Sequence, residues 1–156
     1  MFDANQLMQL AIEKCREGIA KGNSPFGCAI AHGDRLLAVS HNVVWNTVDI
    51  TAHAEVTALR EACRTSGEIL LEDCIVATTC EPCPMCMSAL HWARVSKVYY
   101  GASIADAEDA GFNELSISAA DILRLGGSTV ELVPETMRDE CRQLFADWKA
   151  NGGAAY

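Results

Sequence analysis

The amino-acid sequence predicts an α/β fold, a three-layer α/β/α sandwich with a central mixed five-stranded sheet. Stretches with helical spacing of apolar residues alternate along the chain with short apolar runs that are typical of strands. Strands that alternate with helices imply a mixed sheet covered on both faces. Half of the 156 residues are hydrophobic, and this length is enough to bury a single core. We therefore expect one domain over residues 1–156.

The N-terminal part predicts a helix followed by a β-hairpin. Apolar residues recur at helical spacing over residues 4–20, and Gly22 can end that helix. Two apolar runs, Cys28 to Ala31 and Leu36 to Val39, flank the segment His32-Gly33-Asp34. This pattern is typical of two antiparallel strands joined by a turn that contains glycine.

The middle of the chain predicts two helices and the strand between them. The first helix begins near Thr51 or His53, and β-branched residues over 74–79 predict a short buried strand. Pro82 and Pro84 cannot continue that strand but suit the first turn of a helix, expected over residues 84–94. The apolar face of the first of these helices is expected to hold Val56, Leu59 and Cys63.

The last third of the chain continues the alternation. Strands are expected at residues 97–101 and 129–133, with short helices over 106–110 and 118–125 between them. A C-terminal helix is expected after Pro134. Its buried stripe comprises Met137, Cys141, Leu144, Phe145 and Trp148.

Charge and composition limit the classes of function. The chain has 12 basic and 21 acidic residues, a net charge of −9, and no run rich in lysine or arginine. Such a chain repels polyanions, so a small-molecule substrate is favoured over nucleic acid. The N-terminal segment is charged and lacks the apolar stretch of a signal peptide or a membrane span. We expect a cytoplasmic protein without a membrane partner.

Eight cysteines in a cytoplasmic protein indicate metal binding or catalysis where they cluster, rather than disulfides. Three of them are evenly spaced in the stretch TTCEPCPMC, residues 78–86. The other five lie within apolar patterns and are predicted to be core thiols: Cys15, Cys28, Cys63, Cys74 and Cys141.

Two motifs, TAHAEVTALR and CEPCPMC, fall where helices are expected to begin. The helix dipole stabilises a thiolate there, and the i, i+3 spacing of Cys83 and Cys86 directs both sulfurs to one side. With the imidazole of His53 they would form an open tetrahedral zinc site that keeps a position for water. Glu55 could then carry protons beside the metal without binding it.

Cys80 is the third cysteine of the cluster, and its expected place is the end of a strand. If it also bound, three thiolates and His53 would close the coordination shell, as in structural zinc sites. A structural site has no use for the acid Glu55 beside the metal. Cys80 is therefore predicted to be a core or neighbouring thiol that does not bind the ion.

The combination of His-x-Glu with Pro-Cys-x-x-Cys is the signature of zinc nucleobase deaminases. Over nearly its whole length the chain resembles the cytidine-deaminase-like superfamily, and it is most similar to bacterial guanine deaminases. Besides the two motifs, the similarity is carried by SPFG (24–27), HNVV (41–44), HWAR (91–94), AEDAGFNE (107–114) and Tyr156.

This resemblance implies hydrolysis of guanine to xanthine and ammonia, with one zinc ion on His53, Cys83 and Cys86. Glu55 would carry protons, and Glu114 would contact the base and relay a proton. The resemblance also implies a homodimer, in which Tyr156 would close the pocket either of its own chain or of the partner in a domain-swapped pair. The implied base-binding residues are Phe26, Asn42, the backbone near Ala54, Trp92 and Tyr156.

Several alternatives stay open at this point. The substrate could be another small amino-heterocycle or nucleoside, such as cytosine, adenine or guanosine. A tRNA adenosine deaminase shares the zinc motifs but needs a basic surface, and a structural zinc or binding module would need no acid at residue 55. Individual residues also have plainer interpretations: Phe26 and Trp92 as core aromatics, Asn42 as a turn residue and Glu114 as a surface acid.

Overall fold

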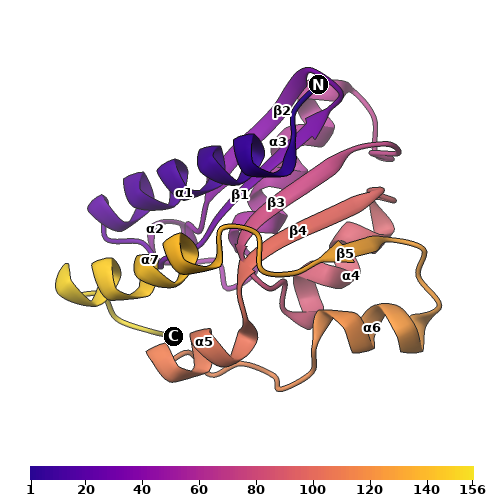
Figure 1. The fold of residues 1–156 in the computed structure, drawn as a ribbon. Helices are drawn as coiled ribbons and strands as arrows, with labels where there is room; N and C mark the ends of the chain where they lie inside the picture. Colours follow the sequence, from indigo (N-terminus) through magenta and orange to yellow (C-terminus); the bar gives the residue numbers. More distant parts are fainter.

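The computed structural model describes residues 1–156 and is organised by one five-stranded sheet with the order β2-β1-β3-β4-β5 (Figure 1). Strand β1 pairs antiparallel with both β2 and β3, whereas β4 pairs parallel with β3 and β5. The mixed five-stranded sheet predicted from the sequence is confirmed. The strands are β1 (Gly27–His32), β2 (Arg35–His41), β3 (Ile75–Cys80), β4 (Lys97–Ala102) and β5 (Glu131–Val133).

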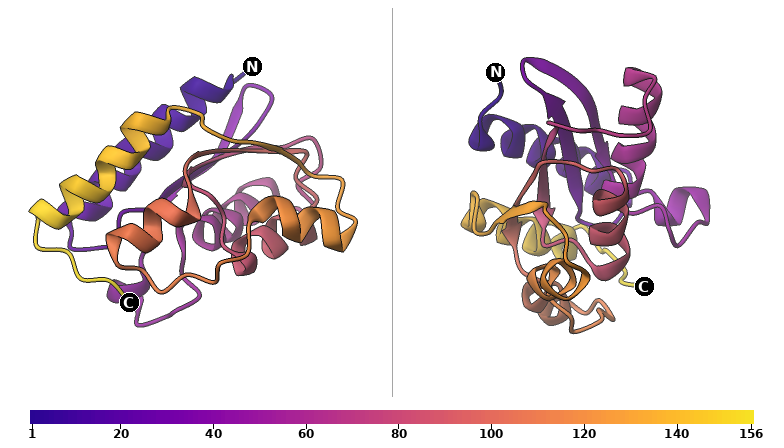
Figure 2. Two further views of the ribbon diagram at one scale, coloured as in Figure 1. Left: turned by 60° about the horizontal axis from the view of Figure 1, so that its bottom comes forward. Right: turned by 90° about the vertical axis from the view of Figure 1, so that its right-hand side faces the viewer.

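Helices cover both faces of the sheet, which confirms the three-layer arrangement (Figure 2). Helices α1 and α7 lie side by side on one face, and α3 and α4 lie on the other, with α6 packed against α4. None of the helices has the length and apolar character needed to cross a membrane. The helices are α1 (Ala4–Ala20), α2 (Val44–Thr47), α3 (Ala54–Ser66), α4 (Pro84–Trp92), α5 (Ile104–Ala110), α6 (Ala119–Gly126) and α7 (Arg138–Ala150).

Two apolar clusters form because side chains alternate between the faces of each strand. The larger residues Ile30, Val76 and Val98 join the cluster under α3 and α4. Alanines at neighbouring positions, such as Ala29 and Ala77, face α1 and α7. These small residues let the α1 and α7 layer approach the sheet closely.

Gly27, the first residue of β1, shows how close that approach is. A Cβ atom at this position would lie 2.1 Å from the backbone oxygen of Ala11 in α1. Only glycine therefore permits α1 to pack this closely against the start of β1.

Most predicted elements are present within two residues of their expected bounds, and α1 coincides with the prediction. The hairpin turns at Gly33, whose φ of +62° suits glycine. The short helix α2 was not expected. Of the predicted core thiols, four are buried, and Cys63 is only partly buried.

The predicted face of helix α3 was wrong in part. The buried face of α3 carries small residues and one carboxylate instead of the predicted apolar residues. Of the three predicted residues, Leu59 is buried, whereas Val56 and Cys63 are only partly buried. The buried residues are Ala54, Glu55, Ala58, Leu59 and Ala62. The difference arises because the alanines pack directly on the sheet and Glu55 turns toward β3.

Candidate active site

Two helices begin at the same place beside the end of β3. His53 is the N-cap residue of α3 and Cys83 that of α4, and both have extended backbone angles. Neither side chain caps its own helix, so the two side chains can point toward each other in the space between the two helix N-termini. Pro84 occupies the first turn of α4, where its missing N–H costs no hydrogen bond. The expected transition from strand to helix at this motif is therefore present.

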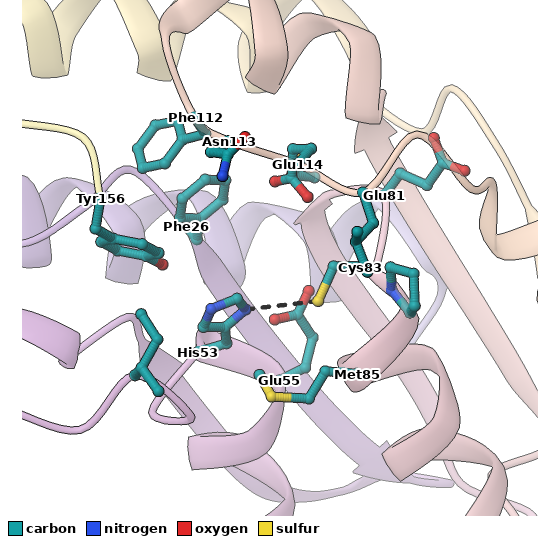
Figure 3. Close-up of a pocket in the computed structure, with 14 residues that line it drawn as sticks. Phe26, His53, Glu55, Glu81, Cys83, Met85, Phe112, Asn113, Glu114 and Tyr156 are labelled. Carbon is teal, nitrogen blue, oxygen red and sulfur yellow. Dashed lines mark hydrogen bonds between the residues drawn. The ribbon is translucent and has the colours of Figure 1, made fainter.

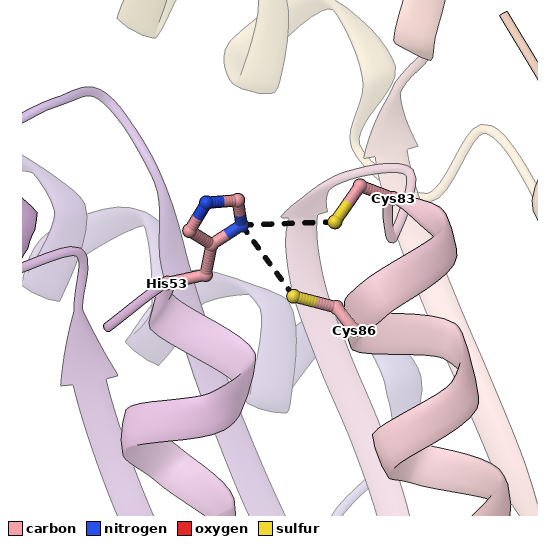
Figure 4. A group of neighbouring side chains, drawn as sticks. All are labelled: His53, Cys83 and Cys86. Atoms are coloured by element: carbon pink, nitrogen blue, oxygen red, sulfur yellow. Dashed lines mark hydrogen bonds between the residues drawn. The ribbon is translucent and has the colours of Figure 1, made fainter. Parts of the chain in front are cut away.

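The side chains of His53, Cys83 and Cys86 converge, and we call this group the His-Cys-Cys site (Figure 4). The Nδ1 atom of His53 lies 3.5 Å from Sγ of Cys86 and 3.7 Å from Sγ of Cys83. Bonds of about 2.1 Å to nitrogen and 2.3 Å to sulfur at tetrahedral angles separate two ligand atoms by about 3.6 Å. The residues present therefore fit zinc, with three protein ligands and one further position.

The thiol of Cys83 differs sharply from that of Cys80 in its affinity for protons. A hydrogen bond from Cys86, aided by His53, lowers the pKa of Cys83 to about 4, so that Cys83 is a thiolate at neutral pH. Burial raises the pKa of Cys80 well above its ordinary value. Its Sγ lies 3.5 Å from the carbonyl oxygen of Ser103, to which it donates a hydrogen bond. Cys80 lies outside the metal-ligand group.

Glu55 lies buried in the first turn of α3, beside the His-Cys-Cys site. Its Oε1 accepts a hydrogen bond of 2.8 Å from the hydroxyl of Thr78 on β3. Burial, followed by the charge of the Cys83 thiolate, raises the pKa of this carboxyl group. A carboxyl group that holds its proton more tightly than usual, without being one of the grouped metal ligands, suits proton transfer.

A cavity of about 360 Å³ opens onto these groups, a volume at the lower end of small-molecule pockets (Figure 3). Glu114 faces it from the segment that follows α5. Burial, and then the charges of Cys83 and Glu55, raise the pKa of Glu114 to about 7. No lysine or arginine lines the cavity. Its wall away from the metal ligands includes Phe26, Ile50, Phe112, Asn113, Leu115 and Tyr156.

Asn42 and Tyr156 meet at one side of the cavity. Asn42 is fully buried, and its Nδ2 donates a hydrogen bond of 2.7 Å to the hydroxyl of Tyr156. Its Oδ1 accepts from the backbone N–H of Val44 at 3.1 Å. Asn42 does not line the cavity, because Tyr156 lies between them. A base can reach the Asn42 amide only if the Tyr156 hydroxyl gives up this hydrogen bond.

Tyr156 belongs to the C-terminal tail, residues 151–156, which returns to the pocket of its own chain (Figure 3). The Nε1–H of Trp45 donates to the carbonyl oxygen of Ala154 at 3.2 Å, and the Trp45 ring meets that of Tyr156 edge-on at 6.3 Å. The Tyr156 ring also lies 5.5 Å from Phe112. No second chain is needed to bring Tyr156 to this position.

Besides Asn42, two of the predicted base-binding residues do not line the cavity. Trp92 is 78% exposed and borders a separate groove with Ile69 and Leu70. It lies six residues beyond Cys86 on the same helix, a rise of about 9 Å that carries it away from the metal ligands. Within one chain Trp92 therefore does not line the cavity, and its contact with the base stays a prediction. Ala54 is fully buried next to His53, and its side chain also lies outside the lining.

The remaining predicted residues do come together, and sequence reasoning missed some of their neighbours. Phe26 lines the cavity and packs edge-on against Phe112 at 4.9 Å. Phe112 and Asn113 stand beside Glu114 in the AEDAGFNE segment, so their position in that motif was the available signal. Trp45 had no local signal, because its partner Ala154 lies 109 positions further along the chain.

Comparison with known proteins agrees with this site. The family model of the cytidine and deoxycytidylate deaminase zinc-binding region matches residues 1–102. The chain therefore belongs to this family and is a zinc-dependent hydrolytic deaminase with the cytidine-deaminase-like fold.

Among individual relatives, guanine deaminase from Bacillus subtilis is 44% identical over 108 residues, which cover 69% of each chain. The structure of guanine deaminase from Nitrosomonas europaea has a TM-score of 0.86 at 26% identity, covering 96% of this chain and 86% of the other. A tRNA-specific adenosine deaminase from Agrobacterium fabrum is 34% identical over 102 residues, covering 65% of this chain and 67% of the other.

Proposed function

We propose that the protein hydrolyses free guanine to xanthine and ammonia. The observation that carries this proposal is the 44% identity to a guanine deaminase, which exceeds the 34% identity to the tRNA adenosine deaminase. The aromatic side chains of the cavity wall and the absence of lysine and arginine from it support a small base without phosphate. The proposal includes residues 1–156 acting as one deaminase unit in the cytoplasm.

The side chains around the cavity suggest how guanine would be held. The N1–H and the 2-amino group of guanine are both donors, and the carboxylate of Glu114 offers two acceptor oxygens to that edge. The Asn42 amide carries a donor and an acceptor for the opposite edge once Tyr156 releases it. Phe26 and Tyr156 would cover the faces of the ring, and the backbone near Ala54 would assist.

The proposed reaction adds water to C2 and expels the amine from the same carbon. Zinc on His53, Cys83 and Cys86 would supply an activated water at neutral pH. Glu55 takes the proton that the water loses as the C–O bond forms. It delivers this proton to N3 of the ring. The second proton of the former water then moves, with Glu114 as a relay, to the departing nitrogen as the C–N bond breaks and the carbonyl group forms at C2. Water and guanine thus give xanthine and ammonia.

A substrate panel tests the proposal. Purified, zinc-loaded enzyme is incubated with guanine, guanosine, adenine, cytosine and an anticodon-loop oligonucleotide, and released ammonia is measured. We expect guanine to be deaminated with a kcat/KM at least about tenfold above that of the others. Inert guanine would overturn the proposal, and a preference for the oligonucleotide would favour the tRNA deaminases among its relatives.

Glu55→Gln tests the role of the proton carrier. Glutamine keeps the size of the side chain and an oxygen that can accept from Thr78, so zinc content and fold should be unchanged. Loss of the proton-transfer group should lower kcat by about 10²-fold or more. Zinc is measured by metal analysis and fold by circular dichroism. A variant with full activity would contradict this mechanism.

The predicted homodimer is a separate part of the proposal. Its support is the resemblance to guanine deaminases. The position of Tyr156 adds no support, because Tyr156 reaches the pocket of its own chain. Sedimentation of the zinc-loaded protein should give twice the mass of one chain. A purely monomeric enzyme with full activity would contradict it.

A further inference from the structure

Glu81 connects three segments that meet beside the cavity. It lies in the short loop between β3 and α4, two residues before Cys83, and its backbone N–H donates to the carbonyl of Ala102 at the end of β4. Its Oε2 accepts from the backbone N–H of Ile104 at 3.0 Å, and its Oε1 accepts from that of Ala119 at 2.9 Å. One carboxylate thus receives the first amides of two helices, α5 and α6.

Ordinary helix capping does not account for this arrangement, which we call the Glu81 bridge. Ser103 already caps α5 by accepting from the Asp106 N–H, and Ser118 caps α6 by accepting from the Asp121 N–H. Glu81 takes the amides that these serines leave free. A carboxylate that accepts two amide hydrogen bonds at helix N-termini makes comparatively strong contacts.

The Glu81 bridge binds the two ends of the chain segment 104–119, at the N–H groups of Ile104 and Ala119. This segment comprises α5 and the stretch 111–118, which brings Glu114 to the cavity. The backbone N–H groups of 111–118 that form hydrogen bonds do so within the stretch or with α5, and none pairs with the sheet. The ring of Phe112 anchors one side of Glu114 by packing on Phe26. The Ala119 amide on Glu81 anchors the other side.

We propose that Glu81 is a positioning residue for the deamination, which fixes Glu114 relative to the metal ligand Cys83. The loop that carries Cys83 also carries the carboxylate that fixes both ends of the Glu114 segment. Without the bridge, the segment keeps its Phe112 anchor but loses its fixed distance from the His-Cys-Cys site. This role rests on the proposed function of Glu114.

The first test is hydrogen exchange of zinc-loaded protein, which needs no substrate. Glu81→Gln keeps the length of the side chain, but its amide group presents N–H to one of the two backbone donors. We expect exchange in residues 104–119 to become at least about fivefold faster, with α4 unchanged. Ser118→Ala is the matched control, because it removes one cap of α6 and leaves Glu81 in place. Exchange that is unchanged in Glu81→Gln, or equally fast in the control, would overturn the proposal.

The second test is a double-mutant cycle with Glu114→Gln, using the best substrate of the panel. Glu81→Gln should keep its zinc and lower kcat by about tenfold in the otherwise unaltered enzyme, because a small misplacement of a catalytic group is costly. In the Glu114→Gln background the same change should lower kcat less than about twofold. Equal losses in both backgrounds would show that Glu81 does not act through Glu114.

Glu81→Asp replaces Glu81→Gln in both tests if Glu81→Gln does not fold. It keeps the charge but is one methylene shorter, so it cannot reach both amides, and the same exchange and kinetic results are expected. The substrate panel on the unaltered enzyme decides the proposed function separately. Failure of that proposal is therefore distinguishable from failure of the bridge.

Discussion

Glu114 is the pocket side chain whose charge changes near neutral pH. Burial and the neighbouring charges of Cys83 and Glu55 raise its pKa to about 7, so it is protonated below that pH and ionised above it. In the proposed function, the ionised form would accept hydrogen bonds from the N1–H and the amino group of guanine. We therefore expect kcat/KM to fall as the pH drops below about 7. Glu114→Gln should lower the rate by about 10²-fold and abolish this limb of the pH profile. A limb that persists in the variant would assign it to another group.

Cys80 and Cys83 allow a matched comparison, because they are three residues apart and only one is in the metal-ligand group. Cys83→Ala should lose most of its zinc, since a thiolate ligand is removed from a site of three. Cys80→Ala should retain about one zinc ion per chain, because the protonated Cys80 thiol is directed at Ser103. Metal analysis of both purified variants decides this, and equal losses would indicate a three-thiolate site.

At the scale of the elements, the C-terminal tail is held on a defined path. Gly153 permits this path, because a Cβ atom there would lie 2.0 Å from Nε1 of Trp148. Further along, Trp45 holds the Ala154 carbonyl and Tyr156 covers Asn42. The tail is thus fixed at three successive points between α7 and the pocket.

We expect loss of the Tyr156 ring to affect activity far more than stability. Tyr156→Ala should raise KM by at least about tenfold, because the pocket loses its cover, while unfolding free energy changes by only about 1 kcal/mol. Trp45→Phe is the companion variant, since it keeps a ring but loses the N–H that binds the tail. It should show a smaller change in the same direction. Steady-state kinetics and urea unfolding measure both, and an unaffected KM in Tyr156→Ala would show that the tail does not cover the substrate.

Sequence reasoning succeeded where spacing within one element decides the outcome. The helical period fixed α1, and the prolines around Cys83 indicated the turn from strand into helix. It failed where contacts between distant elements decide. The sequence alone does not show that Trp92 borders a groove separate from the cavity, nor that Trp45 binds the C-terminal tail.

At the scale of the whole molecule, the His-Cys-Cys site joins the N-terminal ends of α3 and α4, two helices on the same face of the sheet. Zinc that binds the native but not the unfolded chain stabilises it by about 4 kcal/mol at a thousandfold excess over its Kd. For a chain of this size, that corresponds to a rise in Tm of roughly 10 °C. Calorimetry before and after removal of the metal by a chelator measures the difference. Cys83→Ala should show almost none of it, and an equal shift in that variant would place the stabilising metal elsewhere.

The family match ends at residue 102, but some of the residues that line the pocket lie beyond it in the sequence. The metal ligands and Glu55 lie before that boundary. Glu114, its neighbours Phe112 and Asn113, and Tyr156 lie after it. The proposed base contacts are thus encoded on both sides of this boundary, since Phe26 and Asn42 lie before it, and the Glu81 bridge is a physical link between the two stretches. A chimaera joined near residue 102 would therefore need an acid at residue 81, supplied by the first stretch, to hold the Glu114 segment supplied by the second.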